Sequence, residues 1–460
     1  MKAESKHATW SSLFGLLSSV FDLRNKWLLY VLVTLLCSFT TTPAMTPVGE
    51  SEPEGYPFPF RVRGDLAADF GLESPSLSFR QNTALRLFTE KELGKNISAE
   101  LQIYITYSNT DNQFSTSLRD SSFLSRSTSN FLDFFTNNKN DSTLPEWRDI
   151  FNFGETVLNS RLIPKLSLLF DRANIKYRGR FADITLGKQV VAWGSGYAWN
   201  PTDAINLRNP LSPTEPRKGV GALVVDIPFH EWFLLTMAMA PGKIIQESTE
   251  GLRLKFMNRW FDVAFSGNIV GSSERYLLNN SLKTAVDESI NVVKPMVGFD
   301  INTVLPWDIN VWLETSVGAV SLQDSLSISQ TVFGFQRVFF DKLRLLMEFY
   351  ANSLGVSTPY SNKKAVSRNL ALVTLGDMSG ISRSYYALGL QYPFNERWEA
   401  STVFIKNTSD GSWGLAPLLT WQPRQDFKFT TEAHLFGGNY KTTEFGSFKH
   451  SLVMNFKYLF

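Results

Sequence analysis

In the last stretch of the chain, Phe448 to Phe460, apolar or aromatic residues alternate with mostly polar ones. Its even-numbered positions, from Phe448 and His450 onward, are almost wholly apolar or aromatic, and its odd-numbered positions are mostly polar. Side chains of a β-strand point alternately to the two faces of the sheet, so this pattern predicts a strand with one apolar and one polar face. A soluble antiparallel sheet produces the same alternation, because one of its faces meets water.

The alternation closes on an aromatic residue, Phe460. A terminal aromatic residue preceded by apolar residues at every second position resembles the closing strand of bacterial outer-membrane β-barrels. The resemblance implies a chain of similar strands surrounded by outer-membrane lipid. It also implies that the barrel assembly machinery of that membrane recognises this C-terminal strand.

Eighteen stretches of the chain fit such strands. They are 60–71, 75–90, 96–108, 166–178, 182–192, 219–228, 231–241, 250–257, 260–270, 293–305, 307–319, 329–340, 342–352, 383–393, 396–406, 412–422, 426–437 and 446–460. Most have about ten residues, the length with which a tilted strand crosses a bilayer. The sequence therefore predicts an all-β fold, a transmembrane antiparallel β-barrel of about 16–18 strands.

The connections between these stretches are sorted by length. Short ones fall at 228–231, 258–259, 306–307, 341–342, 393–397 and 422–425, and longer polar ones at 109–165, 193–218, 271–292, 353–382 and 438–445. The two kinds alternate through much of the chain. Outer-membrane barrels have short periplasmic turns and long extracellular loops, whereas a soluble sandwich has no reason to sort its connections in this way.

Several internal strands repeat the terminal alternation and predict what faces the lumen. In 311–319, 342–351 and 427–435, apolar residues would face lipid and polar residues would face inward. The inward positions with titratable groups are Glu314, Arg344, Glu348, Tyr350, Lys428, Glu432 and His434. Charges are costly on the lipid face but not in a watery lumen, so a hydrated interior is expected.

Composition agrees with a barrel and excludes several other classes. The mean hydropathy of −0.11 is too low for a bundle of membrane-spanning helices, and the 14% of aromatic residues suits interfacial girdles. Four histidines and one cysteine leave little material for metal or thiol chemistry, so no metal site and no cofactor are expected.

The N-terminal region predicts secretion. Arg24 and Lys26 precede the apolar run 27–39 and the small-residue site that ends at Ala44, which is the order of a signal peptide. The predicted organisation is a signal peptide at 1–44, a periplasmic lead-in at 45–58 and an outer-membrane barrel at 59–460. Removing residues 1–44 leaves equal numbers of basic and acidic residues, which gives no reason to expect a nucleic-acid partner.

The most distinctive internal stretch, Leu186 to Asp203, has the sequence LGKQVVAWGSGYAWNPTD. It resembles a motif of porin-like outer-membrane families, in which Gly-Arg/Lys-Gln is followed by Trp-Gly and then by Asn-Pro-Thr-Asp. One hypothesis is that the loop after this strand folds inward and narrows the pore, and the other is that it packs as an extracellular turn. The constriction candidates are Trp193, Trp199, Asp203, Arg208, Arg217 and Lys218.

A second constellation lies just before this motif. Arg172, Lys176 and Arg178 alternate with apolar residues, so they would place three cations on one lumen wall and favour anionic solutes. The alternative is pairing across strands, with Asp183, Glu314, Glu348 and Glu432 as the candidate anions.

The remaining signals are weaker. Thr143 and Glu146 have the spacing of a helix start within 109–165, which predicts either a short helix in the barrel mouth or, in the first half of the segment, disorder. The Gly194-Ser195-Gly196 stretch lacks the spacing of a nucleophile elbow, and His434 shows no partner in the sequence. The chain is therefore predicted to be a porin-like channel for small hydrophilic or anionic solutes and not an enzyme. The alternatives are a barrel enzyme that acts on lipid or polysaccharide, and a surface-adhesion or structural barrel.

Overall fold

The structure is a computed structural model. It describes residues 63–73, 78–108, 166–206, 217, 219–241, 248–271, 293–321, 326–357, 366, 369, 372–373, 378–439 and 442–460. The predicted signal peptide, the lead-in, the 109–165 helix, Arg208 and Lys218 lie outside these residues, and they stay predictions.

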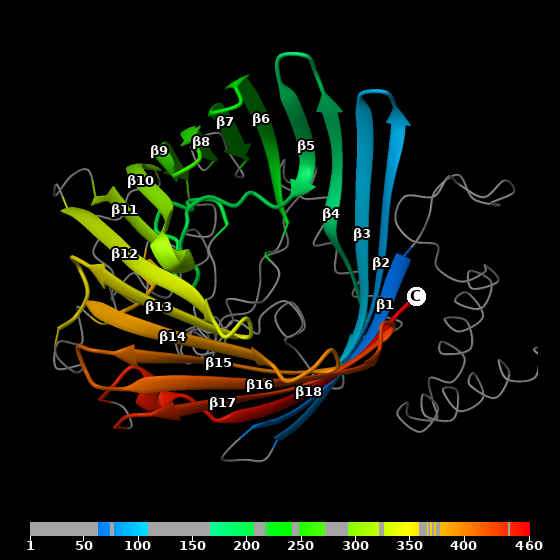
Figure 1. Cartoon of the computed structure of the whole chain (residues 1–460), viewed down its shortest axis with the longest axis vertical. Helices are drawn as coiled ribbons and strands as arrows, with labels where there is room; N and C mark the ends of the chain where they lie inside the picture. Colours follow the sequence, from blue (N-terminus) through cyan, green and yellow to red (C-terminus); the bar gives the residue numbers. More distant parts are fainter. Residues whose placement is uncertain are drawn as a thin grey trace, which may run out of the picture. The chain divides into compact units, whose positions relative to one another are not determined.

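The described residues form eighteen strands (Figure 1). They are β1 (Arg63–Glu73), β2 (Ser78–Gly94), β3 (Ile97–Ser108), β4 (Leu166–Arg178), β5 (Asp183–Gln189), β6 (Val220–His230), β7 (Phe233–Ala240), β8 (Thr249–Met257), β9 (Phe261–Gly271), β10 (Val293–Leu305), β11 (Ile309–Ser321), β12 (Leu326–Phe339), β13 (Leu343–Asn352), β14 (Ser384–Pro393), β15 (Trp398–Asn407), β16 (Trp413–Arg424), β17 (Phe427–Gly437) and β18 (Ser451–Leu459). Two single-turn 3₁₀ helices, η3 (Pro306–Asp308) and η4 (Phe445–Ser447), lie between strands.

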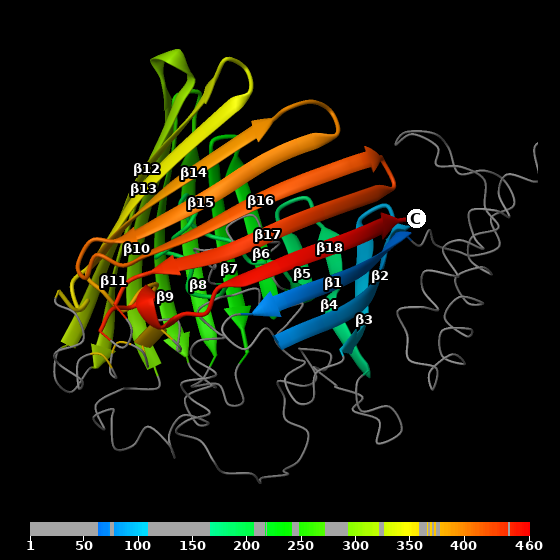
Figure 2. The same ribbon diagram turned by 90° about the horizontal axis from the view of Figure 1, so that it is seen from below.

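The sheet closes on itself. Each strand pairs antiparallel with its neighbours in the chain, and β1 also pairs with β18, from Asp65 opposite Leu459 to Glu73 opposite Ser451. Figure 2 shows β18 (red) and β1 (blue) side by side. The prediction of a closed antiparallel barrel is confirmed, with a strand count at the upper end of the predicted range. No helix in the described part of the chain is both long and apolar enough to cross a bilayer.

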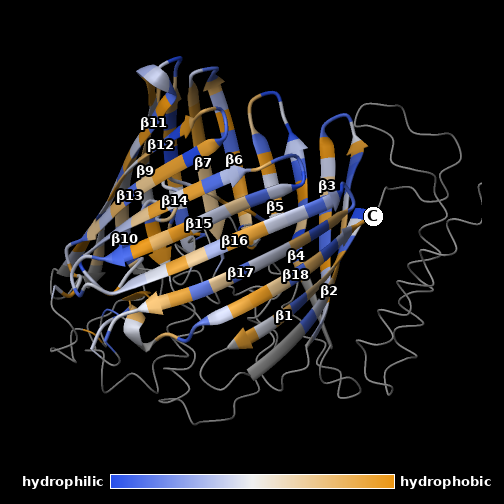
Figure 3. Cartoon of the chain, turned by 60° about the horizontal axis from the view of Figure 1, so that its bottom comes forward, coloured by the Kyte–Doolittle hydropathy of each residue, from blue (hydrophilic) through white to orange (hydrophobic). Residues whose placement is uncertain are grey.

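The two faces of the wall differ as the alternation predicts. In β11, Leu313 and Val317 are 37% and 47% exposed, whereas Glu314 and Ser316 between them are buried. In β18, Met454 and Phe456 are exposed on the outside, and Asn455 hydrogen-bonds to Asp69 of β1. Figure 3 shows the resulting change between hydrophobic and hydrophilic residues along the strands. Apolar side chains therefore cover the outer surface.

Aromatic side chains gather at the short turns. The exposed ones at or near these turns are Phe181, Phe229, Trp232, Trp260, Trp307, Phe340, Phe394, Trp398 and Trp421. Trp398 and Trp421 stack across β15 and β16 with ring centroids 5.5 Å apart. Girdles of aromatic side chains mark the membrane–water interfaces of transmembrane barrels, so this end has the character of an interface.

The C-terminal strand is shorter than the sequence alternation indicated. β18 begins at Ser451, and η4 lies just before it. The prediction that Phe448 and His450 face lipid is therefore wrong. Phe448 packs against Phe436, with ring centroids 5.7 Å apart, and Nδ1 of His450 accepts the backbone N–H of Phe436 at 3.1 Å. Phe448 and His450 continue the apolar alternation of β18 in the sequence, but they pack against Phe436 and do not lie in the strand.

Candidate functional site

The segment after β5 leaves the wall and packs against the inner face of other strands. In Figure 1 it is the green trace that runs from the end of β5 towards the opposite strands. Residues 193–206, called the inner loop below, contact inward-facing side chains of β10, β11, β13 and β14. Of the two hypotheses for this segment, the described contacts agree with a loop that folds inward.

Glycine lets the inner loop approach the wall. Gly194 has φ = 86°, and a Cβ atom there would lie 2.6 Å from both carboxylate oxygens of Glu314. A Cβ atom at Gly196 would lie 1.8 Å from the carbonyl oxygen of Trp199. A side chain at Gly194 would push the loop away from β11, and one at Gly196 would disrupt the turn of the loop itself.

Glu314 of β11 binds the inner loop at two places, residues 195–196 and Thr202. Its Oε2 accepts the backbone N–H groups of Ser195 at 2.8 Å and Gly196 at 3.0 Å. Its Oε1 accepts the N–H of Thr202 at 2.7 Å and the hydroxyl of Thr202 at 2.8 Å. The side chain has no exposed surface. A buried carboxylate needs such donors, and these give it four.

Glu348 of β13 binds the next residues of the loop. Its carboxylate accepts the backbone N–H groups of Tyr197, Ala198 at 2.6 Å and Trp199 at 3.4 Å. Nε1 of Trp312 on β11 donates to the same carboxylate at 2.7 Å. The two glutamates therefore hold the inner loop between Ser195 and Thr202 against β11 and β13.

Aromatic packing adds to this attachment. Trp199 is 2% exposed, and its ring stacks on Tyr350 with centroids 5.4 Å apart and contacts Tyr385 at 6.1 Å. Trp193 covers β8, since a Cβ atom at Gly251 would lie 2.5 Å from its ring. Burying two tryptophans favours the inward position of the loop by several kcal/mol, at roughly 25 cal/mol per Å² of apolar surface.

Asp203 fixes the end of the loop. Its carboxylate pairs with Arg217 and accepts the N–H groups of Asn206 at 2.9 Å and Trp193 at 3.3 Å. Burial raises the pKa of Asp203 to about 6, and the Arg217 charge opposes that rise. The backbone oxygen of Arg217 accepts a hydrogen bond from Arg172 at 3.1 Å, which joins this end to β4.

The three predicted lumen cations are paired with acids of their own part of the wall. Lys176 lies 3.1 Å from Asp183, as the pairing hypothesis expected. Arg172 lies 3.2 Å from Asp171 and 3.9 Å from Glu100, and Arg178 lies 4.0 Å from Glu92. Glu314 and Glu348, offered as alternative partners, instead bind the inner loop.

The other candidates lie apart from the inner loop. Nε2 of His434 is 3.1 Å from Glu432, and its Nδ1 is 3.2 Å from the hydroxyl of Ser451 on β18. His434 therefore lies beside Glu432 of its own strand and beside Ser451 of the neighbouring strand β18. Arg344 is exposed near the start of β13. The structure thus brings Glu314, Glu348, Trp193, Trp199, Asp203 and Arg217 together, and it leaves the other candidates that it describes on the wall.

Sequence reasoning missed several residues of this site. Asp300 of β10 accepts the Ser195 hydroxyl at 2.9 Å and pairs with Arg253 of β8 at 2.9 Å. Trp312, Tyr350 and Tyr385 complete the surface beneath the loop. Asp300 and Trp312 occupy inward positions of the predicted strands, so the period of two could have identified them. The same period does place Tyr350 on the inner face, but it does not indicate that these residues share a partner in the inner loop.

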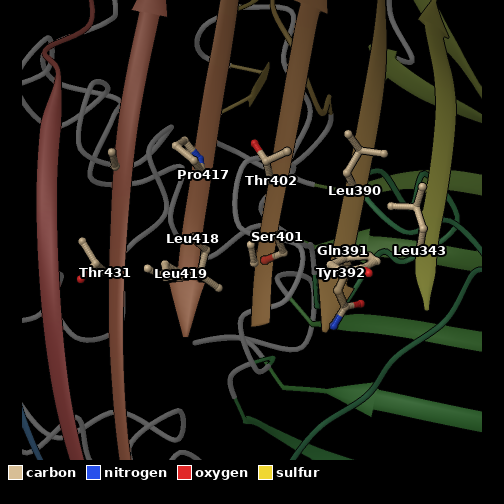
Figure 4. Close-up of a pocket in the computed structure, with 12 residues that line it drawn as sticks. Leu343, Leu390, Gln391, Tyr392, Ser401, Thr402, Pro417, Leu418, Leu419 and Thr431 are labelled. Carbon is tan, nitrogen blue, oxygen red and sulfur yellow. The ribbon is translucent and has the colours of Figure 1, made fainter. Parts of the chain in front are cut away.

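No other part of the described chain suggests a cofactor. Within the described residues, no group of three or more His, Cys, Asp and Glu side chains could hold a metal ion. An apolar groove of about 540 Å³ lies on β13–β17 (Figure 4). Most of its lining residues, including Leu390, Thr402 and Pro417, share the outward register of Leu345, so the groove belongs to the lipid-facing surface.

Comparisons with known proteins bear on the fold. No family model and no curated protein sequence matches the chain. Among solved structures, the chain is similar to OccK11 (OpdR) of Pseudomonas aeruginosa, with a TM-score of 0.51 and 7% identity over 87% of this chain and 95% of that one. For OccK3 (OpdO) of the same organism the TM-score is 0.51 and the identity 7%, over 87% of this chain and 96% of that one. For OccK2 (OpdF) the TM-score is 0.50 and the identity 7%, over 86% of this chain and 97% of that one. The chain has the fold of outer-membrane porin structures, a closed 18-stranded antiparallel β-barrel.

Proposed function

We propose that the protein is a porin-like channel of the bacterial outer membrane, through which small hydrophilic solutes diffuse passively. The inner loop is its constriction. The observation that carries this proposal is the attachment of residues 195–202 to Glu314 and Glu348 on the inner wall. Barrels of 16–18 strands enclose an aqueous passage, and a loop held inside one sets its width.

Three features support the outer-membrane setting. The outer surface is apolar, the short turns carry aromatic residues, and the Gly187–Asp203 stretch resembles the motif of porin-like families. In this proposal residues 1–44 direct secretion, residues 45–58 lead into the barrel, and the assembly machinery binds β18. The external loops lie at the end opposite the aromatic turns.

The lumen cations give the channel a modest preference for anions. Arg172 and Lys176 lie within 3.2 Å of a carboxylate, which cancels much of their field. Arg178 is the freest of the three, because its nearest carboxylate is 4.0 Å away and its side chain is 46% exposed. We propose that Arg178 and Lys176 set the sign of the selectivity together.

The test is single-channel recording of the refolded protein in a planar bilayer, with selectivity taken from reversal potentials. Steady unitary currents are expected, with a weak anion preference that Arg178→Ala reduces. A folded barrel that passes no current would overturn the channel proposal. A cation preference would overturn the role of Arg178 and Lys176 and leave the channel intact.

The role of the inner loop needs its own variant. Glu314→Gln with Glu348→Gln places amide donors against backbone donors, which weakens loop attachment by roughly 3 kcal/mol or more. The expected result is a larger and noisier unit current than in wild type. Glu396→Gln, in the exposed turn 394–397, is the matched control and leaves the current unchanged. Equal currents in all three proteins would show that the loop does not limit conduction.

A further inference from the structure

A second buried acid ties together loops at the other end of the strands from the aromatic turns. Glu444 lies between β17 and β18 and is 3% exposed. Its Oε2 accepts hydrogen bonds from the hydroxyl of Tyr385 at 2.6 Å and from the amide of Asn407 at 2.8 Å. These partners lie at the loop ends of β14 and β15, so one carboxyl group connects three segments.

The surrounding contacts make this a single polar cluster. The Tyr385 hydroxyl also accepts the backbone N–H of Ser382 at 2.6 Å, and the Asn407 amide donates to the Ser382 hydroxyl at 2.7 Å. The backbone N–H of Glu444 donates to Asp410 at 2.7 Å, and Asp410 also accepts from the N–H and hydroxyl of Ser412. The segments 378–383, 407–412 and 442–448 therefore share one set of hydrogen bonds.

Among the residues that the structure describes, the cluster holds acids but no matching cation. The titratable groups that act on Glu444 are Tyr385 of β14, Tyr350 of β13 and Asp410 of the 408–412 loop. Lys406 faces away, with its Nζ bound to the carbonyl oxygen of Gly411. Among the described residues, no Lys, Arg or His forms an ion pair with Glu444. An ionised Glu444 would thus be a buried charge beside Asp410, which is strongly unfavourable.

We propose that the carboxyl group of Glu444 is a pH-sensitive latch: in its neutral form it holds segments 378–383, 407–412 and 442–448 together, and in its ionised form it releases them. Burial raises the pKa of Glu444 to about 7, the hydrogen bond from Tyr385 opposes the rise, and the charge of Asp410 adds to it. A released Glu444 regains the ordinary pKa near 4.5. Because the latched form binds its proton more tightly, latching is strongest below about pH 4.5, weakens as the pH rises to about 7, and is weakest above that.

The latch reaches the inner loop through a hydrophobic cluster. Phe445, next to Glu444, is 3% exposed and belongs to the same buried cluster as Trp199 and Tyr350. Phe436 joins it, with its ring centroid 6.4 Å from that of Phe445. Release of 442–448 removes one side of the packing that surrounds Trp199. If the proposed channel function holds, this packing couples the latch to the constriction. The inner loop is then held less firmly against the wall as the pH rises.

Hydrogen exchange measures the latch without relying on conduction. The readout is the protection factor of residues 442–448 in the refolded protein between pH 5 and pH 8, with intrinsic exchange rates divided out. We expect this protection factor to fall by about tenfold or more in wild type between pH 5 and pH 8, because the latched form binds the proton of Glu444 more tightly than the released form does. Glu444→Gln, which stays neutral, should keep protection constant, and Glu396→Gln should behave as wild type.

Two results would overturn the latch. One is a protection factor in wild type that does not change with pH, which needs no variant. The other is an equal fall in Glu444→Gln, which would assign the titration to another group. Since exchange is measured in any folded barrel, a barrel that fails to conduct refutes the proposed channel and leaves this test intact.

Discussion

At Gly194 the inner loop combines a left-handed backbone angle with no space for a side chain. The Gly194→Ala substitution brings a Cβ atom 2.6 Å from Glu314, in addition to the strain of φ = 86°. The strain alone costs about 1–3 kcal/mol, and the contact adds to it. We expect the loop to detach more often, which single-channel recording should show as a noisier current.

Gly411 provides the matched control. It has φ = 78°, and no atom lies within 4 Å of the position of its Cβ. Gly411→Ala therefore carries the backbone strain without the contact, in a loop that does not touch Glu314. Because this loop belongs to the proposed latch, both variants are recorded at pH 5, where the neutral form of Glu444 holds the latch closed. Current noise that rises equally in both variants would mean that the close approach of Gly194 to Glu314 is not what holds the loop.

The inner loop acts as one element, and Trp199 is its main apolar anchor. Trp199→Ala removes the stacking on Tyr350 and the contact with Tyr385, and truncation of a buried tryptophan costs about 3–5 kcal/mol. The expected result is a larger unit current, since the loop loses its place on the wall. Trp307→Ala changes a side chain that is 74% exposed in a turn and should leave the current as in wild type. A wild-type current from Trp199→Ala would show that the two glutamates suffice.

The strands were predictable because their signal is local. The alternation of apolar and polar residues places β4 and β10 at the predicted bounds, and most other strands within a few residues. The same logic failed at Phe448 and His450, where a hydrophobic cluster follows the strand period before the strand begins. A period of two reports which side chains share a direction, and not where pairing with the next strand ends.

The inner loop could be predicted only in part. The Gly-rich and Trp-rich sequence after β5 indicated a compact loop, and the alternation placed Glu314 and Glu348 on the inner face. The sequence did not show that these glutamates bind the loop, because the loop and its partners are separated by more than a hundred residues. An inward carboxylate that lines water and one that binds backbone N–H groups have the same sequence pattern, and only the fold distinguishes them.

At the scale of the whole barrel, closure depends on one seam. β1 must pair with β18, the other end of the barrel chain, and loop-closure entropy opposes this pairing. Asp65 of β1 bridges Arg86 of β2 and Lys457 of β18, the latter at 3.5 Å. Asn455 of β18 donates a hydrogen bond to Asp69 in addition. The seam is therefore joined by side chains as well as by the backbone.

Asp65→Asn should weaken this seam more than a similar change elsewhere in the wall. It leaves Arg86 and Lys457 as two half-buried cations without their shared anion, at a cost of roughly 3 kcal/mol. The measurement is the temperature at which the folded barrel loses its faster gel migration in detergent, which should fall. Asp262→Asn removes the partner of Lys255 at 3.0 Å, but Asp262 is 43% exposed and lies within the β8–β9 wall, so its effect should be small. Equal falls in both variants would mean that the seam is no weaker than any other pair of strands, and that closure draws its stability from the backbone ladder alone.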